Sequence, residues 1–105
     1  MSATFEVSIG PEAEADLFEI YAYIAERSGR LRAGKYVERI EAFCLSLDTF
    51  PEQGAKRDDL RPNLRTIVYR RQATIVYTID GPRVVILRVF NAGQDYEGAL
   101  REEAD

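Results

Sequence analysis

The apolar residues of this chain follow two periods, one typical of strands and one typical of helices. Residues 4–9 alternate apolar and polar side chains, which indicates a half-buried strand. From Pro11 to about Arg27, and again from Leu31 to about Thr49, apolar residues recur every three or four positions, which predicts two amphipathic helices. Because only residues 28–30 separate the helices, we expect an antiparallel helix hairpin.

The second half of the chain is rich in Val, Ile, Thr, Tyr and Phe, the residues that favour strands. Residues 64–70, 73–79 and 83–90 are predicted to form three consecutive antiparallel strands joined by short turns. The last strand is apolar at nearly every position and should be central in the sheet. Its exception is Arg88, whose guanidinium must be paired or face a polar surface. Strict alternation in this strand would place on one face Val85, Leu87 and Val89, and on the other Val84, Ile86, Arg88 and Phe90.

These elements predict an α+β fold in one domain spanning residues 1–105. The helix hairpin should pack on a twisted, mainly antiparallel four-stranded sheet, in the order strand, helix, helix, strand, strand, strand. Residues 51–63 are polar with Gly and Pro, and read as a loop. Residues 95–103 are weakly helical and would form a short C-terminal tail or helix. We expect the sheet face away from the helix hairpin to stay open and to carry the functional residues.

Composition excludes several kinds of chemistry. The chain has no histidine and one cysteine, so it can build neither a Ser-His or Cys-His nucleophile pair nor a His-based or thiolate metal site. No glycine-rich nucleotide-binding loop is present. We therefore expect no metal and no cofactor. Cys44 lies on the apolar stripe of the second helix, and the prediction is a small core residue. No apolar run is long enough to cross a membrane, so we expect a cytoplasmic protein with no membrane partner.

Charge is unevenly distributed along the chain. The net charge is −4 overall, yet residues 51–90 hold 8 basic and 4 acidic side chains, a local excess of +4. The flanking stretches 1–50 and 91–105 are each acidic by 4 charges. A basic island of this kind suits a phosphate backbone or an acidic partner, and a solvated sheet face is an equally good explanation.

Taken in order, these segments resemble a known family. The hairpin sequences and the strand-rich run resemble ParE-type toxins of the RelE/ParE toxin–antitoxin superfamily over nearly the whole chain. The resemblance rests on residues 15–25, 33–40, 50–54, 64–65, 75–77, 85–90 and 93–95. It implies a small cytoplasmic toxin that forms a hetero-oligomer with a ParD-like antitoxin.

The superfamily contains two activities, and the resemblance implies residues for each. RelE-like members cut ribosome-bound mRNA without a metal, whereas ParE-like members poison DNA gyrase. Asn91 stands where many relatives carry histidine, and Tyr and Lys ordinarily titrate near ~10, so a general acid or base for neutral pH is missing. This departure favours a gyrase inhibitor with no catalytic residues. An mRNA endonuclease that uses Arg65, Arg88, Lys56 and Tyr96, and a non-toxic antitoxin-binding module, stay as alternatives.

Candidate binding residues fall into three groups. The resemblance implies target contacts by Arg65, Arg88, Asn91 and Tyr96. The second group is a basic loop of Lys56, Arg57 and Arg61. The expected antitoxin contacts are Phe18, Tyr21, Tyr36, Arg70 and Arg71. The choice between gyrase, topoisomerase IV and the ribosome as target stays open, as do direct nucleic-acid binding and the stoichiometry of the complex.

Overall fold

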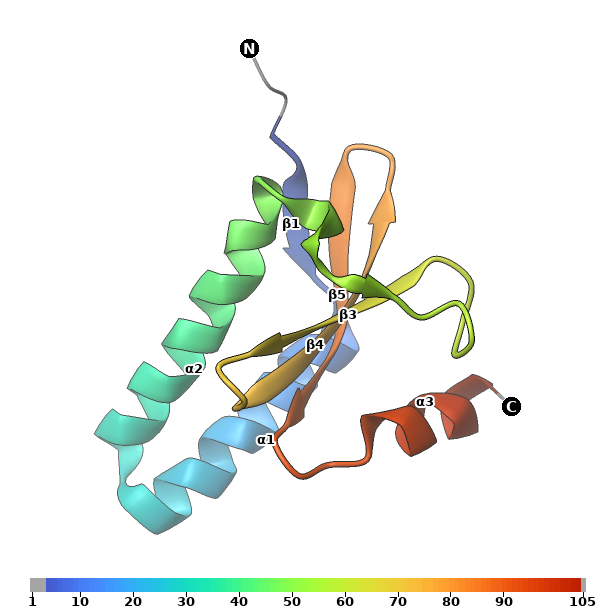
Figure 1. Cartoon of the computed structure of the whole chain (residues 1–105). Coiled ribbons are helices and arrows are strands. Elements are labelled where there is room, and N and C mark those ends of the chain that lie inside the picture. The colour runs from blue at the N-terminus through green and yellow to red at the C-terminus, as the bar shows by residue number, and fades with distance from the viewer. Residues whose placement is uncertain (1–3, 105) are drawn as a thin grey trace.

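A computed structural model describes residues 4–104 and shows two helices on one face of a mixed sheet (Figure 1). The strands lie in the order β1-β5-β4-β3-β2. The strands are β1 (Glu6–Ile9), β2 (Ala55–Lys56), β3 (Leu64–Tyr69), β4 (Ala73–Asp80) and β5 (Arg83–Asn91). The helices are α1 (Pro11–Ser28), α2 (Arg30–Leu45) and α3 (Tyr96–Ala104), with short 3-10 turns at Ser46–Asp48 and Pro51–Gln53.

The predicted α+β class and element order are confirmed, with one extra strand. β3, β4 and β5 form the expected antiparallel meander, and β5 is an interior strand, as predicted, with β4 on one side and the parallel β1 on the other. The addition is β2, which pairs antiparallel with β3 inside the stretch predicted as loop. Two residues are too few to produce a period, so β2 forms only because the edge of β3 offers unpaired backbone groups beside it.

The helix hairpin covers one sheet face as its apolar stripes predict. Ala13, Leu17 and Ile20 of α1 and Ile40 and Cys44 of α2 are buried against the sheet. Cys44 is fully buried, which confirms its prediction as a core residue. The α2 helix ends at Leu45, four residues before the predicted end, and a 3-10 turn over Ser46–Asp48 tightens the exit. None of the helices in the described part of the chain is long and apolar enough to span a bilayer.

Strict alternation along β5 fails in its second half because the strand contains a bulge. Tyr77 of β4 lies opposite Ile86, whereas the preceding Val76 lies opposite Arg88, so Leu87 is an extra residue in β5. The bulge resets which side chains share a face. Val89 therefore joins the core under the helices, and the prediction that grouped it with Val85 and Leu87 is wrong.

The other sheet face is not open, contrary to expectation, because α3 covers it. A second apolar cluster lies between α3 and the sheet, and Leu100 of α3 is only 1% exposed within it. Its buried members are Leu60, Leu64, Val76, Phe90 and Leu100. The sequence of α3 is acidic with few apolar residues and would equally suit a frayed tail, but one deeply buried leucine is enough to dock a short helix.

Candidate functional site

The expected target-binding arginines lie around α3, where they are paired with groups of the chain itself. Arg57 donates through Nε and Nη2 to the two carboxylate oxygens of Asp59, at 3.0 and 2.9 Å. It also pairs with Glu97 of α3 and donates through Nη1 to the hydroxyl of Tyr96 at 2.9 Å. The hydrogen bonds from Arg57, above all to Asp59 and then to Glu97, raise the pKa of its guanidinium. Arg57 is therefore a fixed cation that fastens the basic loop to α3.

Arg88 is held even more tightly, at the bulge of β5. Its Nε and Nη2 donate to the two oxygens of the Asp16 carboxylate, at 2.7 and 2.9 Å. The Arg88 and Asp16 side chains are only 20% and 12% exposed. Glu103 of α3 pairs with Nη1, and the guanidinium lies 4.6 Å from the ring centre of Phe90. The hydrogen bonds to Asp16 are the main reason that the pKa of Arg88 is raised.

Asp16 also accepts a hydrogen bond from the backbone of β5 just after the bulge. The N–H of Val89 has no strand beside it, since β1 ends at Ile9, and it donates to Asp16 Oδ2 at 2.9 Å. One carboxylate of α1 thus satisfies both an arginine and an orphaned backbone donor. Asp16 was not among the predicted site residues. The available signal was a carboxylate three residues after Ala13 and four before Ile20, on an otherwise apolar stripe, which needs a cationic partner.

Arg65 forms hydrogen bonds with the backbone of the segment after α2. Its Nη1 donates to the carbonyl oxygens of Glu52 and Gly54, at 3.1 and 2.8 Å. The buried hydroxyl of Tyr77 completes this anchor, donating to the Pro51 carbonyl at 2.6 Å and accepting from the Gly54 N–H at 2.9 Å. The structure therefore assigns Arg65 a role in holding the segment 51–54 against the sheet.

The remaining target candidates lie at separate places. Lys56 is exposed on β2. The guanidinium of Arg61 is 3.9 Å from Glu103, the weakest of the ion pairs around α3. Tyr96 packs against Phe90 with ring centres 6.1 Å apart. Asn91 accepts a hydrogen bond from the Tyr36 hydroxyl at 3.1 Å.

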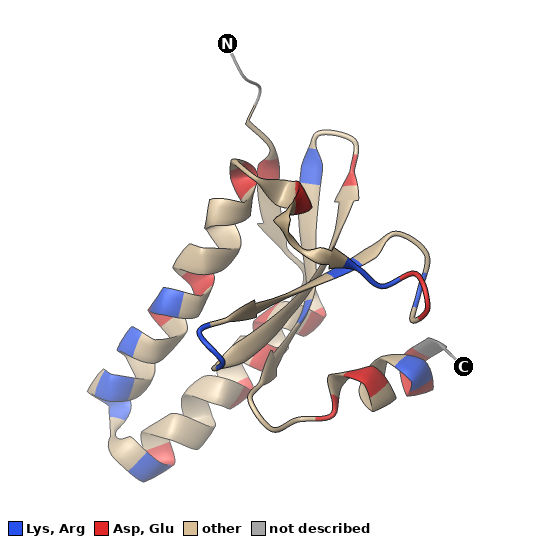
Figure 2. Cartoon of the chain, in the orientation of Figure 1, with Lys and Arg blue, Asp and Glu red and all other residues tan. Residues whose placement is uncertain are grey.

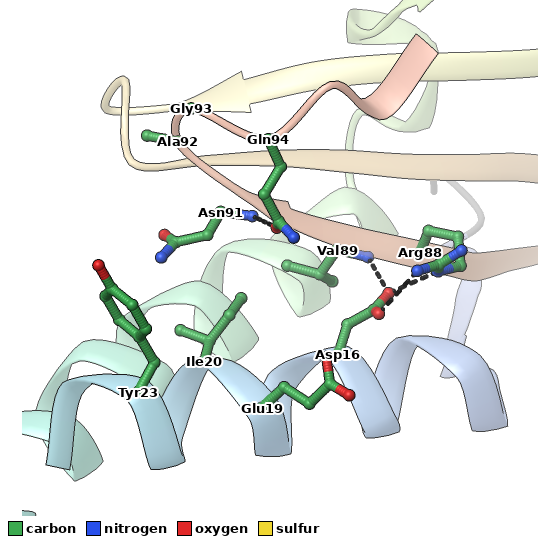
Figure 3. Close-up of a pocket in the computed structure, with 10 residues that line it drawn as sticks. All are labelled: Asp16, Glu19, Ile20, Tyr23, Arg88, Val89, Asn91, Ala92, Gly93 and Gln94. Atoms are coloured by element: carbon green, nitrogen blue, oxygen red, sulfur yellow. Dashed lines mark hydrogen bonds and ion pairs between the residues drawn. The ribbon is translucent and has the colours of Figure 1, made fainter. Parts of the chain in front are cut away.

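A hollow of about 400 Å³ lies between α1 and the end of β5, beside the Asp16–Arg88 pair (Figure 3). Glu19 and Tyr23 line it from α1, Asn91 from the end of β5 and Gln94 from the turn that follows (Figure 3). The two charges of the Asp16–Arg88 pair on its wall already neutralise each other.

Burial raises the pKa of the Tyr36 hydroxyl, so this phenol next to Asn91 stays protonated at neutral pH and acts as a hydrogen-bond donor.

The antitoxin candidates divide between two surfaces. Phe18, 71% exposed, and Tyr21 line a groove between α1 and α2, together with Leu17 and Val37. Tyr36 lies on the opposite flank of α2, where its hydroxyl donates to the backbone carbonyl of Gln72 at 3.3 Å. Arg70 and Arg71 form the exposed turn that precedes Gln72. The five residues therefore do not form one contact surface.

Comparison with known proteins agrees with this architecture. Two solved structures of toxin–antitoxin systems share this fold. The first is a chromosomal ParDE toxin–antitoxin system from P. aeruginosa, with a TM-score of 0.74 and 27% identity over 87% of this chain and 99% of that one. The second is the RelBE2 complex from Mycobacterium tuberculosis, with a TM-score of 0.62 and 18% identity over 84% and 98%, which supports the fold alone.

Sequence comparison identifies the family. Residues 7–96 match the family described as the ParE toxin of the type II toxin–antitoxin system parDE. The chain is also 36% identical over 85 residues to Toxin ParE3 of Caulobacter vibrioides, covering 81% of this chain and 84% of that protein. The chain belongs to the ParE toxin family, and the resemblance inferred from its sequence is confirmed.

Proposed function

We propose that this toxin acts in the cytoplasm by binding and inhibiting DNA gyrase, and that it does not cleave RNA. The internal hydrogen bonds of Arg65 and Arg88 carry the argument against RNA cleavage, and membership of the ParE toxin family supports gyrase as the target. An mRNA-cleaving site needs cations free to hold the scissile phosphate and a group that transfers protons near neutral pH. Here Arg88 is bound by Asp16, Arg65 holds two loop carbonyls, and an asparagine stands beside the protonated Tyr36.

Induction of the toxin alone tests the target. We expect filamentation, an SOS response and, with purified toxin, loss of gyrase supercoiling activity. Co-expression of a ParD-like antitoxin should restore growth and serves as the control. Primer extension on translated mRNA gives the opposite outcome: new 5′ ends without an SOS response would establish the endonuclease instead. Harmless induction in a strain without the antitoxin would favour a non-toxic binding module.

The partner that fits the groove between α1 and α2 is an apolar segment of a ParD-like antitoxin. The groove is lined by Leu17, Phe18, Tyr21 and Val37, and an exposed Phe18 contributes little to the stability of an isolated helix hairpin. A disordered antitoxin tail that folds into an amphipathic helix would place its apolar face there. The similarity to the ParDE system supports this partner.

Substitution in the groove tests the antitoxin contact. Phe18→Glu should weaken binding of the cognate antitoxin by roughly tenfold or more, as expected for an aromatic anchor at an interface. Leu31→Glu is the matched control, because Leu31 is 76% exposed and does not line the groove. Titration calorimetry measures both affinities. Equal affinities for the two variants would place the antitoxin on another surface.

A further inference from the structure

Helix α2 carries a row of exposed basic residues on one side. Arg32, Lys35 and Arg39 are spaced i, i+3 and i+7, so they form one stripe along the helix. All three are exposed, and within residues 4–104 none forms an ion pair. Three arginines close to α3, by contrast, pair with carboxylates: Arg57, Arg61 and Arg88.

The turn between β3 and β4 brings two more arginines to this stripe. The hydroxyl of Tyr36, next to Lys35, donates to the carbonyl of Gln72, and the Phe43 ring lies 4.8 Å from the ring of Tyr69. The two contacts hold the residues before and after Arg70 and Arg71 against α2. Figure 2 shows this turn beside the basic part of α2. We call the five side chains the basic ridge: Arg32, Lys35, Arg39, Arg70 and Arg71.

The turn is made of residues that its backbone does not favour. Arg70 and Arg71 have φ of 48° and 59°, in the left-handed region. They are the two central residues of a β-turn in which the Gln72 N–H donates to the Tyr69 carbonyl at 2.8 Å. A turn with positive φ at both central positions prefers Asn-Gly, because a side chain with a Cβ costs about 1–2 kcal/mol per residue there. Two adjacent like charges add repulsion. Local stability therefore does not explain arginine at either position, and strain of this kind is typical of residues retained for function.

We propose that the basic ridge binds the phosphate backbone of duplex DNA without sequence preference. Duplex DNA carries one negative charge per ~1.7 Å, so it attracts cations spread over a surface more strongly than a short acidic peptide does. The helix stripe spans about 10 Å at 1.5 Å per residue, which reaches several successive phosphates. The basic stretch of α2 and the β3–β4 turn lie away from α3 with its acidic residues (Figure 2), and α2 also carries Glu38 and Glu41. The local positive charge of the ridge favours approach of a polyanion to this side of the molecule rather than to α3.

Two observations favour a duplex over the other polyanionic or acidic partners. Single-stranded nucleic acid binds through bases stacked on exposed aromatic rings. The rings at the ridge are not free for this, since Tyr69 packs on Phe43 and Tyr36 is hydrogen-bonded to Gln72 and Asn91. An antitoxin helix needs apolar anchors, and those lie in the groove on the other flank of α2. DNA binding by the ridge does not depend on gyrase being the target.

Fluorescence anisotropy with a labelled duplex of roughly 20 base pairs at about 50 mM salt tests the proposal on purified toxin without antitoxin. Two ridge variants remove two charges each: Lys35→Gln/Arg39→Gln and Arg70→Asn/Arg71→Gly. The matched control Arg83→Gln/Arg101→Gln removes two exposed charges from β5 and α3. Each ridge variant should weaken binding by about tenfold and lower the slope of log K against log salt by about 1.8, at about 0.9 per lost phosphate contact. The control should bind like the parent.

The turn variant also separates binding from folding. Asn-Gly suits the left-handed turn, so Arg70→Asn/Arg71→Gly should unfold at a higher urea concentration than the parent while it binds DNA more weakly. A decrease in both stability and binding would overturn the proposal. So would a parent that does not bind the duplex, a control that weakens as much as the ridge variants, or tighter binding to the unpaired single strand.

Discussion

At the scale of the residue, the carboxylate of Asp16 decides how Arg88 is used. It accepts two hydrogen bonds from the guanidinium and a third from the N–H of Val89. A charged pair this little exposed is stable only when both partners remain, because removing one leaves the other partly desolvated. Asp16 therefore stabilises the bulge as well as the arginine.

Asp16→Asn should lower the free energy of unfolding by about 2 kcal/mol, because the amide cannot neutralise Arg88 and presents a donor to the Val89 N–H. Urea denaturation measures the loss. Glu19→Gln, an exposed carboxylate one turn along α1, is the control and should change stability by less than about 0.5 kcal/mol. Equal stability of the two variants would show that the Asp16–Arg88 pair contributes nothing.

Cys44 provides a pH prediction at the same scale. Burial, followed by the charge of Glu41, raises the pKa of its thiol from the ordinary 9.0 to about 12. The folded protein therefore holds the proton to higher pH than the unfolded chain does. The resulting stability is fully present below pH 9 and is lost as the pH rises toward 12.

Cys44→Ala isolates this effect, because alanine has no proton to lose. At neutral pH the variant should be less stable than the parent by about 1–2 kcal/mol, the cost of a small cavity. The difference in unfolding free energy between the two proteins should shrink as pH rises above 9.0. Urea titrations at several pH values measure it, and a constant difference would contradict the raised pKa.

At the scale of the element, the segment after α2 is set by its contacts with the sheet. Tyr77 and Arg65 together bind the backbone of Pro51, Glu52 and Gly54. A Cβ at position 54 would clash with the Tyr77 hydroxyl and lie 3.0 Å from the Thr66 carbonyl oxygen. Glycine is therefore required by close approach of the segment to β3 and β4.

Gly54→Ala and Gly34→Ala should change stability in opposite directions. Alanine at 54 must push the segment off Tyr77, which we expect to cost about 1–3 kcal/mol as the buried hydroxyl loses its partners. Gly34 lies within α2, where an added Cβ would meet nothing within 4 Å, so alanine there should stabilise the helix by about 0.5–1 kcal/mol. Thermal unfolding compares the two, and a shift of the same sign for both would refute the close-approach explanation.

At the scale of the whole molecule, α3 covers the second apolar cluster, and its acidic side chains neutralise arginines next to it. Glu97 and Glu103 pair with Arg57 and Arg88, while Leu100 fills the space over the sheet. The arginines next to α3 are thereby paired, whereas the five residues of the basic ridge form no ion pair within residues 4–104. An acidic tail that neutralises one face thus determines which other face can attract a polyanion.

Leu100→Ala should destabilise the protein by about 2–4 kcal/mol and increase binding of a hydrophobic dye, since it opens the second cluster. Leu31→Ala, at a leucine that is 76% exposed, is the control and should leave stability within about 0.5 kcal/mol. A Leu100 variant as stable as the control would mean that α3 is a detachable tail.

The elements were largely predictable because their signals are local. The stripes of α1 and α2 and the β-favouring runs of β3, β4 and β5 each lie within about twenty consecutive residues, where periodicity reports burial directly. Within the site, the sequence indicated that Arg88 required a partner. It could not name Asp16, which lies 72 positions earlier in the chain.

The sequence alone determined the α+β order, the helix hairpin, the central last strand and the absence of histidine chemistry, since period and composition decide these without reference to distant residues. Only the tertiary structure decided which arginines are free. A single extra residue at Leu87 changed which side chains of β5 face the helices, Asp16 became the partner of Arg88, and the docking of Leu100 brought acidic side chains over the other sheet face. Both outcomes depend on contacts between residues that are far apart in the sequence. The local pattern of apolar and polar residues does not predict such contacts.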